Sequence, residues 1–378
     1  MRLVLMLIML AGGLCAQRHK LTINAETPEG ALLQSIGQEA DAGKKLAMME
    51  EFVQKYPKHE GAAWVLEQMV GAYQKANDSD KVIATAEKLL AMDPDDVATA
   101  HNSLKAAEAK KDPELVKRWV ELTSKAARKA VAAPKPASED DLEHWKNSVD
   151  YAKQVDTYTE YSLYAMALAT TDANKKLALY DALQAQSPQS QYLPQLNGVY
   201  FLALRQSNNN EKAIAFAEQV LQKDQSNEDM LLAVAEHYLN KKTEPAKVIS
   251  YGNKLTEVMA SKPKPEGVTD ADWDKRKNLL TGLGHWMVGL TYSGQNKFKE
   301  SDESLRKALP LVEGNDQLKS QTLFLLGLAN YKMGEPRKDK KYLAEALKFN
   351  QQCAAIKSPY QGQAQKNAVV IRQQLGVR

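Results

Sequence analysis

Residues 66–94 read LEQMVGAYQKANDSDKVIATAEKLLAMDP, and this stretch decides the fold. Its apolar residues recur at helical spacing in two runs, one from Leu66 to Tyr73 and one from Val82 to Met92. The polar turn Asn77-Asp78-Ser79 separates the two runs. The second run stops at Asp93-Pro94, because a proline cannot continue a helix. The stretch therefore predicts a pair of short helices followed by a stop.

Similar stops recur along the chain at nearly constant intervals. Pro57 and Pro94 are 37 residues apart, Pro188 and Asp224 are 36 apart, and Asp224 and Pro263 are 39 apart. We expect helices of about 12 to 16 residues, joined by polar turns, to fill each interval. A period of this length is typical of arrays in which every unit is one helix pair that must stack on its neighbours.

The helix pairs resemble the tetratricopeptide repeat (TPR) family, whose pattern is W-x2-L-G-x2-Y and then alanine, an aromatic residue, alanine and proline. The run from Ala86 to Pro94 is similar to the ending of the family's second helix. The stretch from His285 to Leu309 carries Gly289, and the stretch from Leu326 to Leu347 carries Gly327. The segments around Ala100 and Tyr164 are degenerate, because they lack the glycine and several aromatic residues.

The resemblance implies an all-α fold, a right-handed superhelical array or α-solenoid of about seven to eight TPR-like helix pairs over roughly residues 28–357. A last helix near Gln361 to Leu375 would cap the array, since a terminal unit must hide one apolar face. In this family the glycine of the first helix lets the second helix approach closely. The ending Phe52-x3-Tyr56-Pro57 is similar to that of bacterial envelope repeat proteins.

We expect five regions along the chain: a signal peptide (1–16), an extended leader arm (17–27), N-terminal repeats (28–132), a Pro-Lys linker (133–138), and central and C-terminal repeats with the capping helix (139–378). Thr27, followed by Pro28 and Glu29, predicts the start of the first helix. The leader arm includes the β-like alternation Leu21-Thr22-Ile23.

The first residues predict export. Met1-Arg2 is followed by an uncharged apolar run from Leu3 to Leu14 and by the small residue Ala16, as in a secretory signal peptide. The run is too short to cross a bilayer as a helix. We therefore expect an exported, periplasmic protein with no integral membrane span in its mature chain. Secretion, or lipid anchoring through Cys15, is the minor alternative.

Composition excludes several classes of protein. Hydrophobic residues make up 44% of the chain and charged residues 26%, and the mean hydropathy is −0.49, which excludes a polytopic membrane protein. The 50 basic and 47 acidic residues give a net charge of +3, too small to indicate a nucleic acid as partner. Cys353 is the only cysteine beyond the expected signal peptide, so no internal disulfide is expected.

The sequence lacks the common motifs of catalysis, phosphate binding and metal binding, so we expect no catalytic residues, no cofactor and no metal. The chain has no phosphate-binding loop, no nucleophile elbow and no pair of cysteines at ligand spacing. Asp270-x-Asp272-x-Asp274 begins like a calcium loop, but Lys275 stands where that loop needs glycine. We interpret these acids as the first turn of a helix that contains Trp273. An enzyme is therefore considered unlikely.

A stripe of aromatic and apolar residues gives the candidate binding site. By register with the TPR pattern, seven residues fall on positions that line the concave groove: Trp64, Tyr238, Trp286, Leu290, Phe324, Leu328 and Tyr331. The groove would take an apolar or amphipathic helix, and we expect no capture of an acidic C-terminus, because the lysines and asparagines of such clamps are missing. Internal packing of the same side chains is the open alternative.

These observations favour an exported TPR scaffold in the cell envelope that binds a protein or peptide partner in an apolar concave groove. The alternative function is a structural subunit of an envelope assembly or transport machine that docks through its convex face or its caps. The identity of the partner and the oligomeric state are outside what the sequence predicts.

Overall fold

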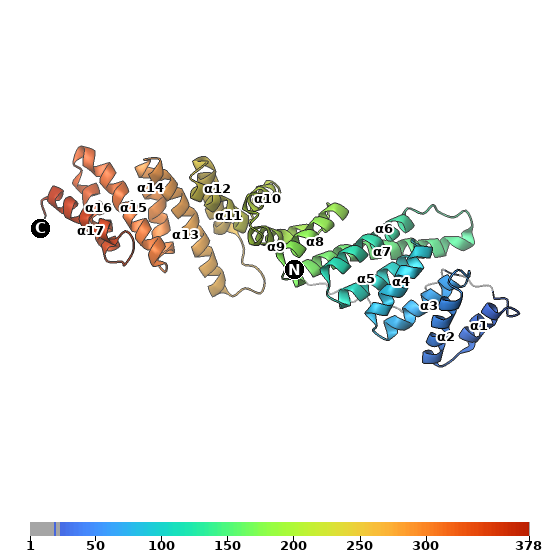
Figure 1. The fold of residues 1–378 in the computed structure, drawn as a ribbon. Coiled ribbons are helices and arrows are strands. Elements are labelled where there is room, and N and C mark those ends of the chain that lie inside the picture. Colours follow the sequence, from blue (N-terminus) through green and yellow to red (C-terminus); the bar gives the residue numbers. More distant parts are fainter. Residues whose placement is uncertain (1–18, 20–22, 378) are drawn as a thin grey trace. The chain divides into compact units, whose positions relative to one another are not determined.

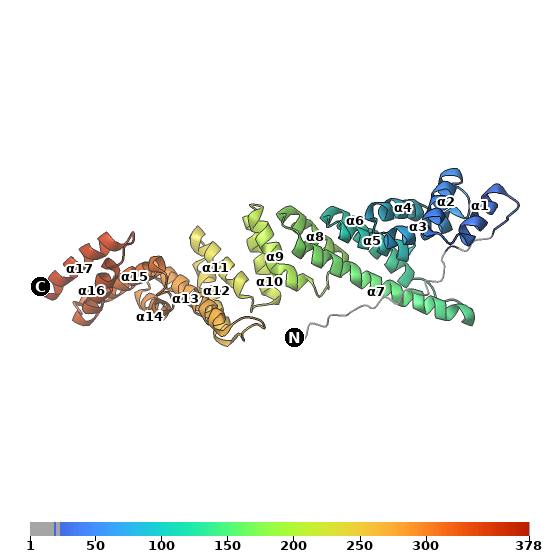
Figure 2. The ribbon, with the colours of Figure 1, turned by 90° about the horizontal axis from the view of Figure 1, so that it is seen from below.

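The computed structural model describes residues 19 and 23–377, and the described residues contain helices and no β-strand. The expected signal peptide, residues 1–16, and residues 17, 18 and 20–22 of the expected leader arm lie outside them. The chain divides into two compact units between Asn208 and Asn209. Figures 1 and 2 show the helices of each unit from two directions.

The first unit contains nine α-helices within residues 23–208. They are α1 (Pro28–Gln38), α2 (Ala42–Lys55), α3 (Ala62–Lys75), α4 (Ser79–Met92), α5 (Val97–Ala109), α6 (Pro113–Val131), α7 (Glu139–Ala169), α8 (Ala173–Gln186) and α9 (Leu193–Gln206).

The second unit contains eight α-helices within residues 209–377. They are α10 (Asn210–Lys223), α11 (Glu228–Lys241), α12 (Pro245–Ser261), α13 (Asp270–Gly294), α14 (Phe298–Ala308), α15 (Asp316–Gly334), α16 (Lys340–Ala354) and α17 (Gln361–Leu375). Two single turns of 3-10 helix, η1 (Leu309–Leu311) and η2 (Glu335–Arg337), follow α14 and α15.

Within each unit, every helix packs on the next one along the chain. The packed pairs are α1 with α2, α3 with α4, α5 with α6, α7 with α8, α11 with α12, α13 with α14, and α15 with α16. The odd-numbered helices also contact one another, α3 to α9 in the first unit and α11 to α15 in the second. The prediction of an all-α helical repeat array is confirmed, and α17 packs on α16 at the end of the array.

Five helices of the described residues are longer than the 12 to 16 residues expected: α6, α7, α12, α13 and α15. The two longest are α7 and α13. Helix α7 has 31 residues and α13 has 25, and the length of α7 is plain in Figure 2. Residues 139–169 contain no glycine or proline, and Glu139, Asp140 and Asp141 in the first turn complement the helix dipole. Helix α13 contains four glycines, three of which lie against neighbouring elements, so packing offsets their low helix propensity.

The capping signals of the sequence set the helix ends. The Thr27 side chain accepts a hydrogen bond from the Gly30 N–H at 3.1 Å, which starts α1 as predicted. Thr269 caps α13 by accepting from the Asp272 N–H at 3.2 Å, so the acids from Asp270 onward begin a helix. Asn77, with φ of 56°, makes the predicted turn between α3 and α4.

The expected linker 133–138 is a loop between α6 and α7. The two helices it joins share a core cluster with α5, in which Ala126 and Ala127 of α6 meet Ala152 and Val155 of α7. The Trp145 indole N–H donates to the Ala133 carbonyl oxygen at 3.2 Å and ties the loop to α7.

Across residues 19 and 23–377, no helix has both the length and the apolar character that a membrane crossing requires. The same residues contain no group of three or more histidine, cysteine, aspartate or glutamate side chains arranged to hold a metal ion.

Candidate functional site

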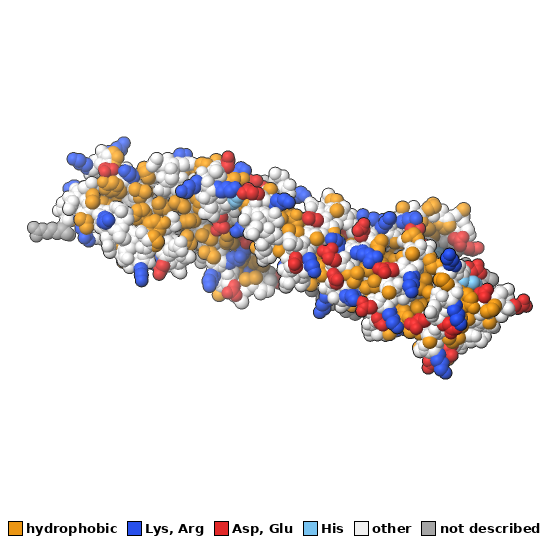
Figure 3. All heavy atoms as spheres, in the orientation of Figure 1, with side chains coloured by type: hydrophobic (Ala, Val, Ile, Leu, Met, Phe, Trp, Pro, Cys, Tyr) orange, Lys and Arg blue, Asp and Glu red, His pale blue; other side chains and the backbone are white. Residues whose placement is uncertain are grey.

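The candidate site is built on α13 and α15, two odd-numbered helices that contact each other. Leu283, Trp286 and Leu290 repeat at helical spacing on one face of α13, and all three are half-buried. Leu279, one turn before them on the same face, is 45% exposed. Figure 3 shows hydrophobic side chains gathered over the part of the surface formed by α13 to α15.

Helix α15 carries the matching stripe. Phe324, Leu328 and Tyr331 are spaced by four and three residues and are half-buried. We call the side chains on the two helices the apolar face, comprising Leu279, Leu283, Trp286, Leu290, Phe324 and Leu328. A half-buried face of this kind still has apolar area that a partner could remove from water.

Part of the apolar face also supports the core. Trp286, Leu290 and Phe324 pack against a buried cluster that joins α14, α15, α16 and α17 and includes Leu305, Leu326, Phe349 and Cys353. The Tyr360 ring, which precedes α17, lies 5.1 Å from the Phe324 ring, centroid to centroid. Internal packing, the alternative considered from the sequence, therefore accounts for one side of these rings.

Trp286 shares one feature with Trp119, the fully buried tryptophan of α6. Its indole N–H is buried and finds no hydrogen-bond acceptor among the described residues. A buried donor without a partner costs free energy, typically about 1–3 kcal/mol.

Tyr331 is tied down by polar contacts. Its hydroxyl donates to Glu335 Oε1 at 2.5 Å and accepts from Gln374 Nε2 at 3.1 Å, and the ring packs against Leu343, Ala346 and Ile371. The hydrogen bond to Glu335 raises the pKa of the Tyr331 hydroxyl. Tyr331 thus connects α15 to α16 and α17.

Tyr238 is also part of a polar cluster, here between α10, α11 and α12. Its hydroxyl donates to Glu218 Oε1 at 3.0 Å, and Lys247 Nζ lies 2.8 Å from the same oxygen and 2.9 Å from the Tyr238 hydroxyl. Burial opposes ionisation of Glu218, but the hydrogen bonds from Lys247 and Tyr238 outweigh it and lower the pKa of Glu218. A polar cavity of about 780 Å³ opens beside Glu218 and Lys247.

The remaining predicted residue, Trp64, lies half-buried on α3 of the first unit. The structure therefore gathers Trp286, Leu290 and Phe324 around one cluster, with Leu328 on the same helix as Phe324. Leu279 and Tyr360 belong to the site and were missed from the sequence. The continued helical spacing from Leu279 to Leu290 could have revealed the first.

Close helix contacts hold α13 in place. A methyl group on Gly289 would lie 2.6 Å from Leu305 Cγ of α14, and one on Gly327 would lie 2.4 Å from Asn350 Nδ2 of α16. These are the two glycines that match the TPR pattern, and they act as that pattern implies. On its other side, α13 meets α12 with Gly284 against Gly252.

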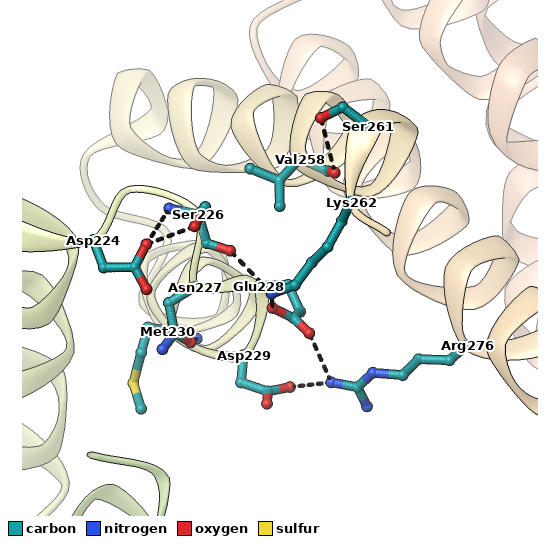
Figure 4. Close-up of polar contacts among 10 residues, drawn as sticks. All are labelled: Asp224, Ser226, Asn227, Glu228, Asp229, Met230, Val258, Ser261, Lys262 and Arg276. Atoms are coloured by element: carbon teal, nitrogen blue, oxygen red, sulfur yellow. Dashed lines mark hydrogen bonds and ion pairs between the residues drawn. The ribbon is translucent and has the colours of Figure 1, made fainter. Parts of the chain in front are cut away.

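An ion-pair network fixes the start of α13 (Figure 4). Glu228, at the start of α11, is 9% exposed and pairs with Lys262 at the end of α12. Arg276 of α13 reaches Glu228 at 3.5 Å and Asp229 at 2.7 Å. Burial opposes ionisation of Glu228, yet the hydrogen bond and charge of Lys262, together with Arg276, lower its pKa. Three consecutive helices thus meet at one carboxylate.

No protein-family model matches the chain, and no curated protein matches it. Among solved structures, the TPR domain of P58(IPK) is 11% identical, with 93% of this chain and 99% of that chain covered and a TM-score of 0.26. Human IFIT1, in a dimer with PPP-AAAA, is 14% identical over 92% of this chain and 81% of that one, with a TM-score of 0.32. Yeast Tom70 is 12% identical over 93% and 82%, with a TM-score of 0.24. The resemblance of the chain to TPR proteins rests on its helix pairs and on the close contacts at Gly289 and Gly327.

Proposed function

We propose that the chain is a protein-binding scaffold that takes an apolar or amphipathic helix of a partner on the apolar face of α13 and α15. The observation that carries the proposal is the half-buried apolar stripe itself, in which Leu279 is 45% exposed and Leu283, Trp286 and Leu290 keep part of their apolar area open to solvent. A helix that presents leucine-like side chains would bury the rest of that stripe.

The apolar face suits a helix better than an acidic peptide end. Its members are leucine, tryptophan and phenylalanine, and none carries a charge. Binding would therefore depend on buried apolar area and weakly on salt. The two stripes follow helical spacing on α13 and α15, so an occupant with leucines three and four residues apart would match them.

A charge placed on the face tests the proposal with little effect on the core. Leu279→Glu changes a side chain that is 45% exposed, so the variant should fold with a normal circular dichroism spectrum. Cross-linking and affinity purification of the tagged chain should lose its helix-bearing partner. Trp286→Phe, which reduces the apolar area of the face, should weaken the same interaction. Retention of every partner by both folded variants would refute the proposal.

The alternative, a structural subunit that docks through a cap, is favoured by one observation. Helix α17 buries Ala364, Ala368 and Ile371 against the array but leaves Val369 and Val370 about half exposed, at 51% and 48%. Val370→Glu is therefore the matched control for Leu279→Glu. Partner loss in Val370→Glu alone would point to cap docking in place of the apolar face.

We also propose that the chain is exported and acts in the periplasm or cell envelope. The basic start, the apolar run from Leu3 to Leu14 and the small residue Ala16 support this proposal. Mass spectrometry of the protein from its native host tests it. The expected mature chain begins at Gln17. A chain beginning at Met1 would contradict export by cleavage, and an acylated Cys15 would show a lipid anchor.

A further inference from the structure

A row of tyrosines lies on the odd-numbered helices of the first unit and belongs to no site described above. Tyr158, Tyr161 and Tyr164 follow one another on α7 at three-residue spacing, and Tyr192 immediately precedes α9, which packs on α7. We call these four residues the tyrosine strip. Tyr161 is 46% exposed, and the other three are half-buried.

The rings of the tyrosine strip contact one another. The centroid of the Tyr161 ring lies 6.1 Å from that of Tyr158, 6.3 Å from that of Tyr164 and 6.1 Å from that of Tyr192. Tyr164 and Tyr192 stack at 4.9 Å with an angle of 23° between their planes. Leu168, 49% exposed, extends the surface one turn beyond Tyr164. The strip is thus a continuous aromatic surface that is partly exposed to solvent.

One end of the strip is rigidly held. The Tyr158 hydroxyl donates to Glu108 Oε2 of α5 at 2.7 Å, and the Ser162 hydroxyl donates to Glu108 Oε1 at 2.5 Å. The His101 ring lies 5.1 Å from the Tyr158 ring. Because Tyr158 is fixed by these contacts, the rings that follow it are supported from one side, which lowers the entropy lost when a ligand binds.

The other hydroxyls are available. Those of Tyr161, Tyr164 and Tyr192 make no hydrogen bond to any other described residue. A partner that covers the strip must offer them acceptors, because a buried hydroxyl without a partner costs free energy. The chemistry of a fitting ligand is therefore flat apolar groups that lie against tyrosine rings, interleaved with hydrogen-bond acceptors.

We propose that the tyrosine strip binds a proline-rich segment of a partner protein in the polyproline II conformation. Polyproline II has no internal hydrogen bonds, so its carbonyl oxygens are free to accept from the three tyrosine hydroxyls, while its pyrrolidine rings pack on the exposed surface of the aromatic rings. An α-helix fits less well, because its backbone carbonyls are already paired within the helix.

Titration of the full chain with an acetylated, amidated decaproline peptide tests the inference, with tyrosine fluorescence or calorimetry as readout. We expect saturable binding. Tyr161→Ala should weaken it by about tenfold or more, as for an interface residue that dominates affinity. Tyr161→Phe, which removes only the hydroxyl, should weaken it by about two- to tenfold, the equivalent of one hydrogen bond. Neither variant should unfold, since Tyr161 is largely exposed.

Matched controls separate this site from others. Tyr342→Ala removes a tyrosine of similar exposure, 38%, from α16 of the second unit and should leave decaproline binding unchanged. Leu279→Glu should also leave it unchanged, so failure of the apolar face and failure of the tyrosine strip can be told apart. No saturable decaproline binding, or equal binding by Tyr161→Ala, would overturn the inference. Preferential binding of a glycine-serine decapeptide, a helical peptide or a cello-oligosaccharide would overturn it as well.

Discussion

Gly284→Ala is the most direct test of how the second unit is packed. Helices α12 and α13 approach so closely that a methyl group on Gly284 would lie 2.8 Å from the Gly252 carbonyl oxygen and 2.7 Å from Thr256 Cγ2. The Thr256 side chain can rotate. The Gly252 oxygen belongs to the backbone of α12, so relief of that contact requires the two helices to move apart.

Two opposing effects set the expected size of the change. Alanine is favoured over glycine inside a helix by about 1 kcal/mol. Overpacking a close contact costs typically about 1–3 kcal/mol, and a backbone contact lies at the upper end because it cannot be relieved by a rotamer change. The net expectation is a loss of about 2 kcal/mol in the free energy of unfolding.

Urea unfolding followed by far-UV circular dichroism measures this loss, and calorimetry should show the unfolding temperature lowered by several degrees for a unit of this size. Gly198→Ala is the control. Gly198 is exposed in the middle of α9, and a methyl group there would meet nothing within 4 Å, so the variant should be stabilised by up to about 1 kcal/mol. If Gly284→Ala were stabilised as much as Gly198→Ala, the close approach of α12 and α13 would be refuted.

Three further predictions rest on charge and burial. Glu228→Gln should destabilise the second unit by about 1–3 kcal/mol, because Lys262 and Arg276 lose their shared partner. The folded pKa of Glu228 is lowered, so the difference from the parent chain should be present above about pH 4.3, the unfolded pKa, and vanish in urea titrations as the pH falls through the folded pKa. The Nδ1 atom of His101 lies 3.0 Å from the Tyr151 hydroxyl. Burial and the nearby charge of Lys105 lower the pKa of His101 to about 4. It stays neutral in the folded chain, so the first unit should lose stability as the pH falls from about 6.5 toward 4, and His101→Gln should flatten that dependence; an NMR titration of His101 near pH 6.5 would contradict this. Cys353 is fully buried and burial raises its thiol pKa to about 11, so an aromatic disulfide reagent should label the native chain far more slowly than the urea-unfolded chain, and equal rates would show that the thiol is accessible.

Local signals in the sequence predicted the helices and their close contacts. A helix cap or a proline stop acts over a few residues, so Thr27 and Thr269 could be interpreted without knowledge of the fold. Gly289 and Gly327 were predicted to sit where paired helices approach, and they do. The predicted lengths of α7 and α13 were wrong, because a helix of 12 to 16 residues was expected in segments that contain no stop.

The candidate site was harder to predict, because helical spacing gives the face of a helix and not what lies opposite that face. Tyr238 and Tyr331 were predicted from their spacing alone, whereas their hydrogen-bond partners come from other helices or turns: Glu218, Lys247, Glu335 and Gln374. The tyrosine strip lies in a segment judged degenerate for lack of a glycine. Its three-residue spacing on α7 was visible in the sequence, whereas the arrival of Tyr192 beside it depends on packing.

The Glu228 network also bears on where the chain can be opened. Lys262 and Arg276 lie on either side of the Pro-rich loop that joins α12 to α13, and both are held by the same carboxylate. Gly267 in that loop is exposed and has a φ of 83°. If the chain were cut beside Gly267, or a domain inserted there, the ion pairs to Glu228 would still hold the adjoining ends of α12 and α13 together. This loop is therefore a suitable place for a reporter domain or a protease site.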